Sequence, residues 1–431
     1  MEDIKVGKAK LNGKVKIPPS KSMAHRAIIC AALSFGKSTI YNIDYSDDIN
    51  ATIDGMKALG AKIEKNEDSL TIYGAFREDA KRDTVRMIDC NESGSTLRFL
   101  VPISLLFDGM TKFIGKGNLG KRPLDIYFDI FKEQGSIRYS NTEGILNLMV
   151  KGDFNNGEFN LPGNISSQFI TGLLFSLPLL KGDSKIILTT ELESKGYIDL
   201  TIECMKDFGV IIENNNYKEF FVKGNQEYIS REYKVEGDYS QAAFYLCANA
   251  LGNEVELEDL KLDSLQGDKE VIDILERMGM TFDFSKNITG KINGELKSTL
   301  IDASQCPDII PVLSLAASLA NGRTEIINAK RLRIKECDRL HAIYSELTKL
   351  GANIVEKEDS LIIDGVKELE GGVEVWSYKD HRIAMTLAIA ATVCKNPIII
   401  KDYNCVAKSY PNFFEDYKML GGDVSECNVG K

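Results

Sequence analysis

The strongest constraint on the fold of this chain is a segment of helix end, turn and two short strands that recurs along it. The segments LGAKIEKNEDSLTIYG at 59–74 and LGANIVEKEDSLIIDG at 350–365 share one pattern. Each copy carries an anchor glycine where the end of a helix needs left-handed backbone. The anchors are Gly60, Gly135, Gly209, Gly279, Gly351 and Gly421, at spacings of 75, 74, 70, 72 and 70 residues. Because such spacing does not arise by chance, the sequence predicts six copies of one repeat of about 72 residues.

Apolar helices recur in the same phase as the glycines, and each begins with a residue that favours a helix start. Serine and aspartate cap free backbone N–H groups, and proline suits the first turn. The predicted starts are Pro19, Ser93, Ser166, Asp238, Pro307 and Asp380. These stretches are apolar nearly all round, so we expect them to be buried. Strands that alternate with helices predict an α/β protein, and 431 residues predict two domains of three repeats each.

Composition excludes several classes of function. The formal net charge of −10 disfavours nucleic acid and anionic membranes as partners. The apolar runs are too short to span a bilayer, and no secretory leader is evident. The nine cysteines form no CxxC pair, so neither a disulfide framework nor a zinc site is expected, and a reducing cytoplasm fits. No metal or other cofactor is predicted.

The helix starts predict binding of anions. Buried helices in equivalent surroundings should point the same way within a domain, so their N-termini should gather on one face. A helix N-terminus has free N–H donors and partial positive charge, and contributes about 0.3–1 kcal/mol to anion binding. Lys and Arg residues near several such ends would make a strong site. We therefore expect small phosphorylated anions to bind where the repeats converge.

Polar residues collect near these starts in both halves of the chain. In the first half they are Lys21, Ser22, Arg26, Gly94, Arg98, Lys121, Arg122, Ser166, Ser167, Gln168, Ser194 and Tyr197. In the second half they are Asp308, Lys335, Glu336, Arg339, Asp380, His381, Arg382 and Lys408.

Two carboxylates and a lysine among these cations suggest proton transfer. Asp308 would stay ionised beside cations and is a candidate base, and Glu336 is a second carboxylate. Lys335 and Arg339 are expected on one helix face. The GxGxxG of 115–120 is not interpreted as a dinucleotide site, because no acidic residue closes a strand about 20 positions later.

Taken in order, these motifs resemble those of the EPSP synthase family of enolpyruvyl transferases. The resemblance covers the whole chain and rests on PSKSMAHRA, ESGSTLRFL, KRPLD, SSQF, ESKGYIDLT, PDIIP, RIKECDRL, KDHRIAM and KSYPNFF. It implies two similar α/β domains, each an inside-out barrel of three βαβαββ repeats. One domain would be 1–19 with 237–431 and the other 20–236, with crossovers near 18–20 and 236–239. The N-terminal strand would join the C-terminal domain.

The resemblance also implies a reaction. The enolpyruvyl group of phosphoenolpyruvate would pass to the 5-hydroxyl of shikimate 3-phosphate by addition and elimination, with release of phosphate. The catalytic group would be Asp308, Glu336 and Lys21. Shikimate 3-phosphate would contact Lys21, Ser22, Arg26, Ser166, Ser167, Gln168, Ser194, Tyr197, Asp308 and Lys335. Phosphoenolpyruvate would contact Lys21, Gly94, Arg122, Gln168, Arg339, Arg382 and Lys408. Family membership further implies a cytoplasmic monomer that glyphosate inhibits.

Two positions depart from the family pattern, and two other functions stay open. Glu92 stands where the family commonly has Asn, and Arg331 stands where an Asn contact to the shikimate phosphate is often found. One alternative is a UDP-N-acetylglucosamine enolpyruvyl transferase, although 113–124 lacks the reactive cysteine of that family. The other is a non-catalytic, repeat-built clamp. An inactive homologue is disfavoured because the chain retains Lys21, Asp308 and the second-half cations.

Overall fold

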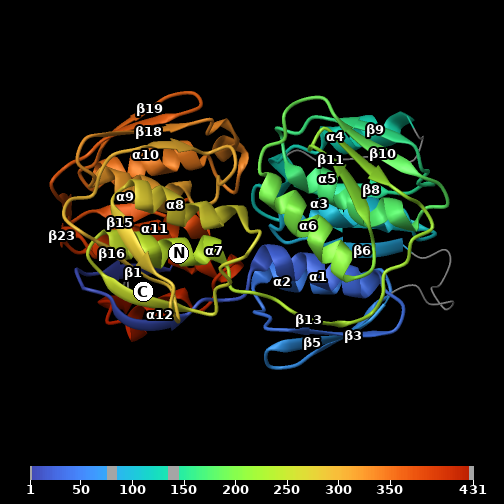
Figure 1. Cartoon of the computed structure of the whole chain (residues 1–431), viewed down its shortest axis with the longest axis horizontal. Coiled ribbons are helices and arrows are strands. Elements are labelled where there is room, and N and C mark those ends of the chain that lie inside the picture. The colour runs from blue at the N-terminus through green and yellow to red at the C-terminus, as the bar shows by residue number, and fades with distance from the viewer. Residues whose placement is uncertain (1, 75–84, 134–144, 427–431) are drawn as a thin grey trace. The chain divides into compact units, whose positions relative to one another are not determined.

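The computed structural model describes residues 2–74, 85–133 and 145–426, and the chain forms two compact units (Figure 1). The terminal unit joins residues 1–18 to 237–431, and the central unit is residues 19–236. Helices and short strands alternate along both, so the predicted α/β class is confirmed. No helix in the described ranges is long and apolar enough to cross a membrane.

The central unit contains three repeats, and each has an inner helix, a second helix and short strands. The first comprises α1 (Lys21–Leu33), β3 (Lys37–Tyr41), α2 (Asp47–Ala58), β4 (Lys62–Lys65) and β5 (Ser69–Tyr73). The second comprises β6 (Val85–Asp89), α3 (Gly94–Ser104), β7 (Met110–Ile114), α4 (Asp125–Glu133) and β8 (Asn147–Val150). The third comprises β9 (Glu158–Leu161), α5 (Ser167–Ser176), β10 (Ser184–Leu188), α6 (Lys195–Asp207), β11 (Ile212–Asn215) and β12 (Glu219–Val222), followed by β13 (Glu232–Lys234).

The terminal unit repeats the same plan after two N-terminal strands. These are β1 (Asp3–Val6) and β2 (Asn12–Lys16). The fourth repeat comprises α7 (Tyr239–Ala250), β14 (Glu254–Glu258), α8 (Glu270–Arg277), β15 (Met280–Asp283) and β16 (Thr289–Ile292). The fifth comprises β17 (Leu300–Asp302), α9 (Ile310–Ser318), β18 (Arg323–Ile327), α10 (Arg339–Lys349), β19 (Asn353–Glu356) and β20 (Leu361–Asp364). The sixth comprises β21 (Leu369–Gly371), β22 (Glu374–Trp376), α11 (His381–Ala391), β23 (Cys394–Asn396), β24 (Ile398–Lys401), α12 (Phe413–Met419) and β25 (Val424–Glu426).

Strand pairing shows how the repeats are joined. In the third repeat β9 and β10 flank α5 in the chain and pair in parallel, and the sheet order is β11-β12-β10-β9. The fifth repeat matches it with β19-β20-β18-β17. In the sixth, β1 pairs antiparallel with both β24 and β25, and the sheet order is β22-β24-β1-β25. The N-terminal strand β1 therefore takes the position that β20 has in the fifth repeat.

A reciprocal exchange occurs where the chain passes from one unit to the other. Strand β2 precedes α1 in the chain but pairs in parallel with β14 of the terminal unit. Strand β13 precedes α7 but pairs in parallel with β3 of the central unit. In each unit, the first strand of one repeat is therefore supplied by the segment that directly precedes the first helix of the other unit in the sequence.

The inner helices form the core of each unit, as their apolar sequences predict. Helices α7 and α11 are buried along their whole length, and α3 and α5 nearly so. The repeated glycines end the second helix of each repeat. Gly60, Gly209, Gly279, Gly351 and Gly421 have φ between +87° and +110°, the backbone that the C-cap prediction requires, while Gly135 lies outside the described residues.

The fifth repeat departs from the predicted helix starts. Helix α9 begins at Ile310, so Asp308 lies in the turn before it rather than in its first turn. Helix α10 begins at Arg339, capped by Asp338, and Lys335 follows a short 3₁₀ turn at Lys330–Ile334. Lys335 and Arg339 therefore do not share a helix face, because the Asp338 carboxylate accepts the His341 N–H and starts a new helix.

Candidate active site

In the central unit, polar residues at the starts of α3 and α5 lie together. Ser93 and Ser166 cap the two helices with their side-chain oxygens. The Gln168 amide donates to Ser95 Oγ at 2.9 Å, and its oxygen accepts from Arg98 Nη1 at 2.6 Å. The predicted residue Gln168 is thus fixed between two helix starts, where backbone N–H groups favour an anion.

Arg26 is a buried cation held by neutral groups. It donates from Nε to Thr201 Oγ1 at 2.8 Å, from Nη2 to the Tyr197 carbonyl at 2.8 Å and from Nη1 to the Ser22 carbonyl at 2.6 Å. Burial lowers the pKa of Arg26 to about 10, and no carboxylate among the described residues forms an ion pair with it. These bonds join α1 to α6, which begins after the buried Ser194. A bound anion would supply the negative charge that is missing beside this guanidinium.

Lys21 has a carboxylate partner that the sequence did not identify. Its Nζ lies 2.8 Å from Asp48 Oδ2, and only 17% and 7% of the two side chains are exposed. Asp48 lies in the first turn of α2, where an acidic residue is read simply as favourable to the helix start. The predicted ligand-binding lysine is therefore held in place by a second helix start.

The absence of a side chain at Gly94 leaves space for two arginine side chains at the start of α3. A Cβ built on Gly94 would lie 2.9 Å from Arg122 Nη1 and 3.2 Å from Arg98 Nη1. Any side chain at this position would displace both guanidinium groups. Arg98, which the predicted contacts omitted, therefore belongs to the same group of cations as Arg122.

A chain of neutral hydrogen bonds ties the starts of α1, α2 and α3 together. His25 Nδ1 lies 2.8 Å from Thr52 Oγ1, which lies 2.7 Å from Thr96 Oγ1, and Thr96 donates to Ser93 Oγ at 2.8 Å. Complete burial lowers the pKa of His25 to about 3, so the ring is neutral at physiological pH. His25 holds this cluster of helix starts without adding charge.

In the terminal unit, Asp308 is surrounded by three cations. It lies 3.1 Å from Lys335 Nζ, 2.8 Å from Arg339 Nη1 and 3.5 Å from Arg382 Nη2. These three charges hold the pKa of Asp308 well below its usual range, although burial alone would raise it. Asp308 is therefore ionised and can accept a proton but cannot supply one.

Arg339 connects the carboxylates of this cluster. It is 1% exposed and lies 2.7 Å from Asp380 Oδ2 and 2.6 Å from Glu336 Oε2, besides its contact with Asp308. The three carboxylates raise its pKa well above the usual range against the effect of burial. Asp308 and Glu336 are thus held on one guanidinium. Asp380, predicted only as a helix cap, is a third anchor and also caps α11 through the Arg382 N–H.

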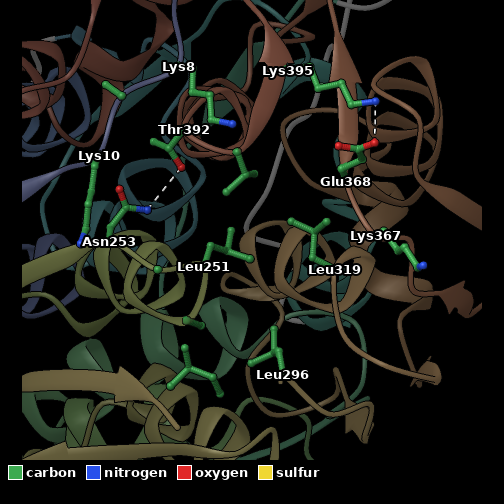
Figure 2. Close-up of a pocket in the computed structure, with 15 residues that line it drawn as sticks. Lys8, Lys10, Leu251, Asn253, Leu296, Leu319, Lys367, Glu368, Thr392 and Lys395 are labelled. Carbon is green, nitrogen blue, oxygen red and sulfur yellow. Dashed lines mark hydrogen bonds and ion pairs between the residues drawn. The ribbon is translucent and has the colours of Figure 1, made fainter. Parts of the chain in front are cut away.

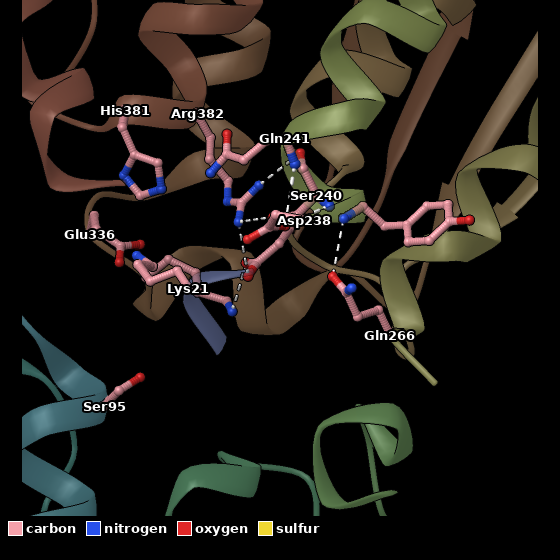
Figure 3. A network of polar contacts seen from close by, with 12 residues as sticks. Lys21, Ser95, Asp238, Ser240, Gln241, Gln266, Glu336, His381 and Arg382 are labelled. Atoms are coloured by element: carbon pink, nitrogen blue, oxygen red, sulfur yellow. Dashed lines mark hydrogen bonds and ion pairs between the residues drawn. The ribbon is translucent and has the colours of Figure 1, made fainter. Parts of the chain in front are cut away.

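The starts of α7 and α11 meet at Arg382 (Figure 3). Its Nη2 donates to Ser240 Oγ at 3.0 Å, and Asp238 caps α7 by accepting from the backbone N–H groups of Ser240 and Gln241. The remaining predicted cation, Lys408, lies in a 3₁₀ turn with its Nζ 4.0 Å from Glu336 Oε1, and it is 7% exposed. Arg382 and Lys408 therefore border the same cluster.

Lys335 differs from Arg339 because its pKa is lowered and not raised. Burial, with Arg331 and Arg339 nearby, lowers its pKa to about 8 despite the attraction of Asp308. Arg331, one of the two departures from the family pattern, thus acts electrostatically on a predicted phosphate contact. The other departure, Glu92, lies against the backbone of Gly117, since a Cβ built on that glycine would overlap the Glu92 carboxylate.

The two units therefore carry different chemistry at their helix starts. The central unit presents hydroxyls, an amide and cations, and the terminal unit presents carboxylates held among cations. Within residues 2–74, 85–133 and 145–426, no group of three or more His, Cys, Asp or Glu side chains could hold a metal ion.

Comparison with known proteins gives a single result. The sequence model of the EPSP synthase (3-phosphoshikimate 1-carboxyvinyltransferase) family matches residues 6–417. The 3-phosphoshikimate 1-carboxyvinyltransferase of Clostridium beijerinckii is 66% identical over 436 residues, and that of Clostridioides difficile is 65% identical over 438 residues. Both alignments cover all of this chain and all of the relative.

Solved structures agree on the fold. The EPSP synthase of Acinetobacter baumannii superposes with a TM-score of 0.82 at 24% identity, covering 99% of this chain and 100% of that one. The enolpyruvyl transferase NikO of Streptomyces tendae gives a TM-score of 0.82 at 17% identity, covering 100% and 99%. The sequence model and the full-length relatives show that the chain belongs to the EPSP synthase family.

Proposed function

We propose that this chain acts as a 3-phosphoshikimate 1-carboxyvinyltransferase, with Asp308, Glu336 and Lys21 as its proton-transfer groups. The reaction joins phosphoenolpyruvate to the 5-hydroxyl of shikimate 3-phosphate and releases phosphate, a step of the shikimate pathway. The observation that carries the proposal is that Asp308 and Glu336 share one buried guanidinium, that of Arg339. Relatives of 61–66% identity over the full chain support the choice of reaction.

The proposed steps balance protons between the two carboxylates. Glu336 donates a proton to the methylene carbon of phosphoenolpyruvate, which leaves a cation-like centre at the neighbouring carbon. The 5-hydroxyl oxygen bonds to that carbon as Asp308 takes its proton. In the elimination step Glu336 takes back a proton from the methyl group, the carbon–oxygen bond to phosphate breaks and the vinyl group reforms. The departing phosphate takes the proton from Asp308, which returns both carboxylates to their starting states. General acid–base steps of this kind contribute about 10²–10⁴ each.

Binding of the anionic substrates would increase the basicity of Asp308. Three cations make Asp308 a weak base in the free protein. When anionic substrates attract Lys335, Arg339 and Arg382, the carboxylate loses part of this stabilisation and its basicity rises. The same cations stabilise the charge that develops in the transition state.

The proposed substrate contacts are those that the family resemblance implies. The central unit supplies Lys21, Ser22, Arg26, Gly94, Arg122, Ser166, Ser167, Gln168, Ser194 and Tyr197. The terminal unit supplies Asp308, Lys335, Arg339, Arg382 and Lys408. A cytoplasmic setting is supported by the eight cysteines among the described residues, which are all free thiols. Inhibition by glyphosate and a monomeric state remain predictions.

One assay tests the reaction. Purified protein mixed with shikimate 3-phosphate and phosphoenolpyruvate is expected to release inorganic phosphate and to form one enolpyruvyl ether per phosphate. A matched reaction replaces shikimate 3-phosphate with UDP-N-acetylglucosamine and should release none. Release only with the nucleotide sugar would assign the chain to the other enolpyruvyl transferases.

The depressed pKa of Lys335 predicts an alkaline limb in the activity profile. Above pH 8 Lys335 loses its proton and with it the attraction for a phosphate dianion. We therefore expect kcat/KM for shikimate 3-phosphate to fall as pH rises through about 8. Arginine stays charged at this pH, so Lys335→Arg should move the fall to higher pH even if the overall rate is lower.

The free energy of unfolding should change with pH in the direction opposite to kcat/KM, which provides a check on the assignment to Lys335. Because the folded-state pKa of Lys335 is lowered from 10.5 to about 8, the unfolded chain binds more protons between these values. The contribution of Lys335 to the free energy of unfolding should thus rise with pH over this window. A fall in kcat/KM that survives Lys335→Arg unchanged would assign the limb to another group.

A further inference from the structure

A cavity opens at the C-terminal ends of three inner helices of the terminal unit (Figure 2). Its volume is about 700 Å³, within the range of sites for small molecules. It is lined at the ends of α7, α9 and α11 by Leu251, Leu319 and Val393. Since α7 has 12 residues, the cavity lies roughly 18 Å from the helix start at Asp238. The cavity is therefore distinct from the candidate active site.

The lining combines an apolar floor with a basic rim. The floor includes Leu251, Leu296, Leu319 and Val393. The rim carries four lysines against a single acidic residue, Glu368, although the chain as a whole has a net charge of −10. The lysines are Lys8, Lys10, Lys367 and Lys395. A local excess of cations beside partly buried apolar side chains favours a ligand that is both anionic and apolar.

The four lysines are not equally available. Lys10 lies 2.6 Å from Glu254, and Lys395 lies 2.5 Å from Glu368 and 2.8 Å from Glu370. Lys8 and Lys367 have no ion pair or hydrogen bond to another described residue. Figure 2 shows the Lys8 side chain extending over the cavity, whereas Lys367 extends to its side. Lys8 is therefore the available cation above the apolar floor.

Helix capping does not account for Lys8. Basic residues commonly neutralise the partial negative charge of helix C-termini. Here the C-cap N–H groups of Leu251, Leu319 and Thr392 turn back onto the last carbonyls of α7, α9 and α11. Asn253 adds side-chain bonds to the Ala248 carbonyl and to Thr392 Oγ1. Local groups therefore bond the Ala248, Ala316 and Ala390 carbonyls, and no helix-end hydrogen bond within the described residues comes from the Lys8 ammonium.

We propose that this cavity binds a small amphipathic anion, with its apolar body on Leu251, Leu296, Leu319 and Val393 and its anionic group at Lys8. The site does not depend on the proposed reaction, because the residues that line it take no part in it. It gives the terminal unit a ligand site at each end of its inner helices.

The probe 8-anilinonaphthalene-1-sulfonate tests the proposal, since it joins two aromatic ring systems to one sulfonate and fluoresces in apolar sites. With the full-length protein we expect saturable binding of one probe, unchanged by saturating shikimate 3-phosphate and phosphoenolpyruvate. Lys8→Glu should weaken binding at least tenfold and leave catalytic activity unaltered. The matched control is Lys5→Glu, which makes the same charge change on an exposed residue of β1 outside the cavity.

Further measurements distinguish binding in this cavity from binding elsewhere on the protein. N-phenyl-1-naphthylamine, the same probe without sulfonate, should bind at least tenfold more weakly and be indifferent to Lys8→Glu. Leu319→Trp, with folding checked by thermal melting, should reduce binding of both probes by filling the floor. The proposal is overturned if substrates displace the probe, if the neutral probe binds equally well, or if Lys5→Glu and Lys8→Glu act alike. A concentration-dependent dimer that Lys8→Glu dissociates would also overturn it, by assigning the cavity to a second copy of the chain.

Discussion

Replacing Arg339 with glutamine is expected to lower the free energy of unfolding by about 3–5 kcal/mol, because three carboxylates lose their shared cation. Asp380 and Arg339 are 0% and 1% exposed, and Asp308 and Glu336 are 18% and 12% exposed. Water therefore cannot replace the guanidinium at Asp380 and can do so only in part at the other two. Urea denaturation of the wild-type and variant proteins measures the difference.

The pH dependence of this loss identifies its cause. In the wild type the pKa of Asp308 is depressed, so its contribution to stability is present above pH 3.8 and is lost as pH falls through the lower folded value. In Arg339→Gln, Asp308 keeps only Lys335 and Arg382 as cationic partners, so its pKa should be depressed less than in the wild type. The difference between the two proteins in the free energy of unfolding should thus narrow as the pH is lowered below 3.8.

An exposed arginine on the same unit provides the matched control. Arg323 forms a bidentate pair with Asp364 at 2.8 and 3.0 Å, but 59% of the Arg323 side chain is exposed. Arg323→Gln should therefore cause little measurable loss, because water solvates Asp364 in its place. Equal losses in the two variants would show that Arg339 does not stabilise the fold through buried charge.

Local chemistry made much of the fold predictable. Anchor glycines such as Gly60 and Gly351 mark a backbone conformation that few other residues adopt, so their spacing identifies the repeat without knowledge of any contact. The caps Ser93, Asp238 and Asp380 stand at their predicted helix starts. Such a cap can be predicted because its side chain bonds the backbone of its own helix, so residue type and local position are enough to identify it.

Contacts between distant segments were not predictable in the same way. The exchange of β2 and β13 pairs Asn12 with Glu254 and Glu232 with Thr39, and nothing local to 12–16 or 232–234 specifies these partners. Family resemblance suggested that the first strand joins the C-terminal domain and where the chain crosses between domains, but it gave neither strand a partner. Local residues can mark a strand, but its partner depends on the packing of the whole unit.

The candidate site shows the same limit at the level of side chains. Lys21, Asp308 and Arg339 stood out by type and position, yet their partners Asp48 and Asp380 looked like ordinary helix-start residues. The expected helix face for Lys335 was wrong because Asp338 starts a new helix between it and Arg339. That cap was visible in the sequence, but the meeting of Lys335 and Arg339 at Asp308 depends on tertiary packing.

Asp308→Asn is expected to lower kcat by at least 100-fold while the protein remains folded. The amide keeps the shape of the carboxylate but cannot take the proton of the attacking hydroxyl, and general base catalysis is worth about 10²–10⁴. The fold should survive because Arg339 retains Glu336 and Asp380 as partners. Steady-state kinetics with both substrates varied, together with a thermal melt, measure the two effects.

The split between kcat and KM distinguishes a base from a residue that only positions its neighbours. Loss of the base should act mainly on kcat, whereas loss of a positioning charge at Lys335 and Arg382 should act mainly on KM for the anionic substrates. Asp302→Asn is the matched control, since Asp302 lies six residues earlier and its carboxylate accepts hydrogen bonds from the Ser304 backbone and Asn328. It should leave both constants near the wild-type values. If Asp308→Asn keeps its kcat and raises only KM, Asp308 binds substrate without acting as the base, and the proton must pass to Glu336 or Lys21.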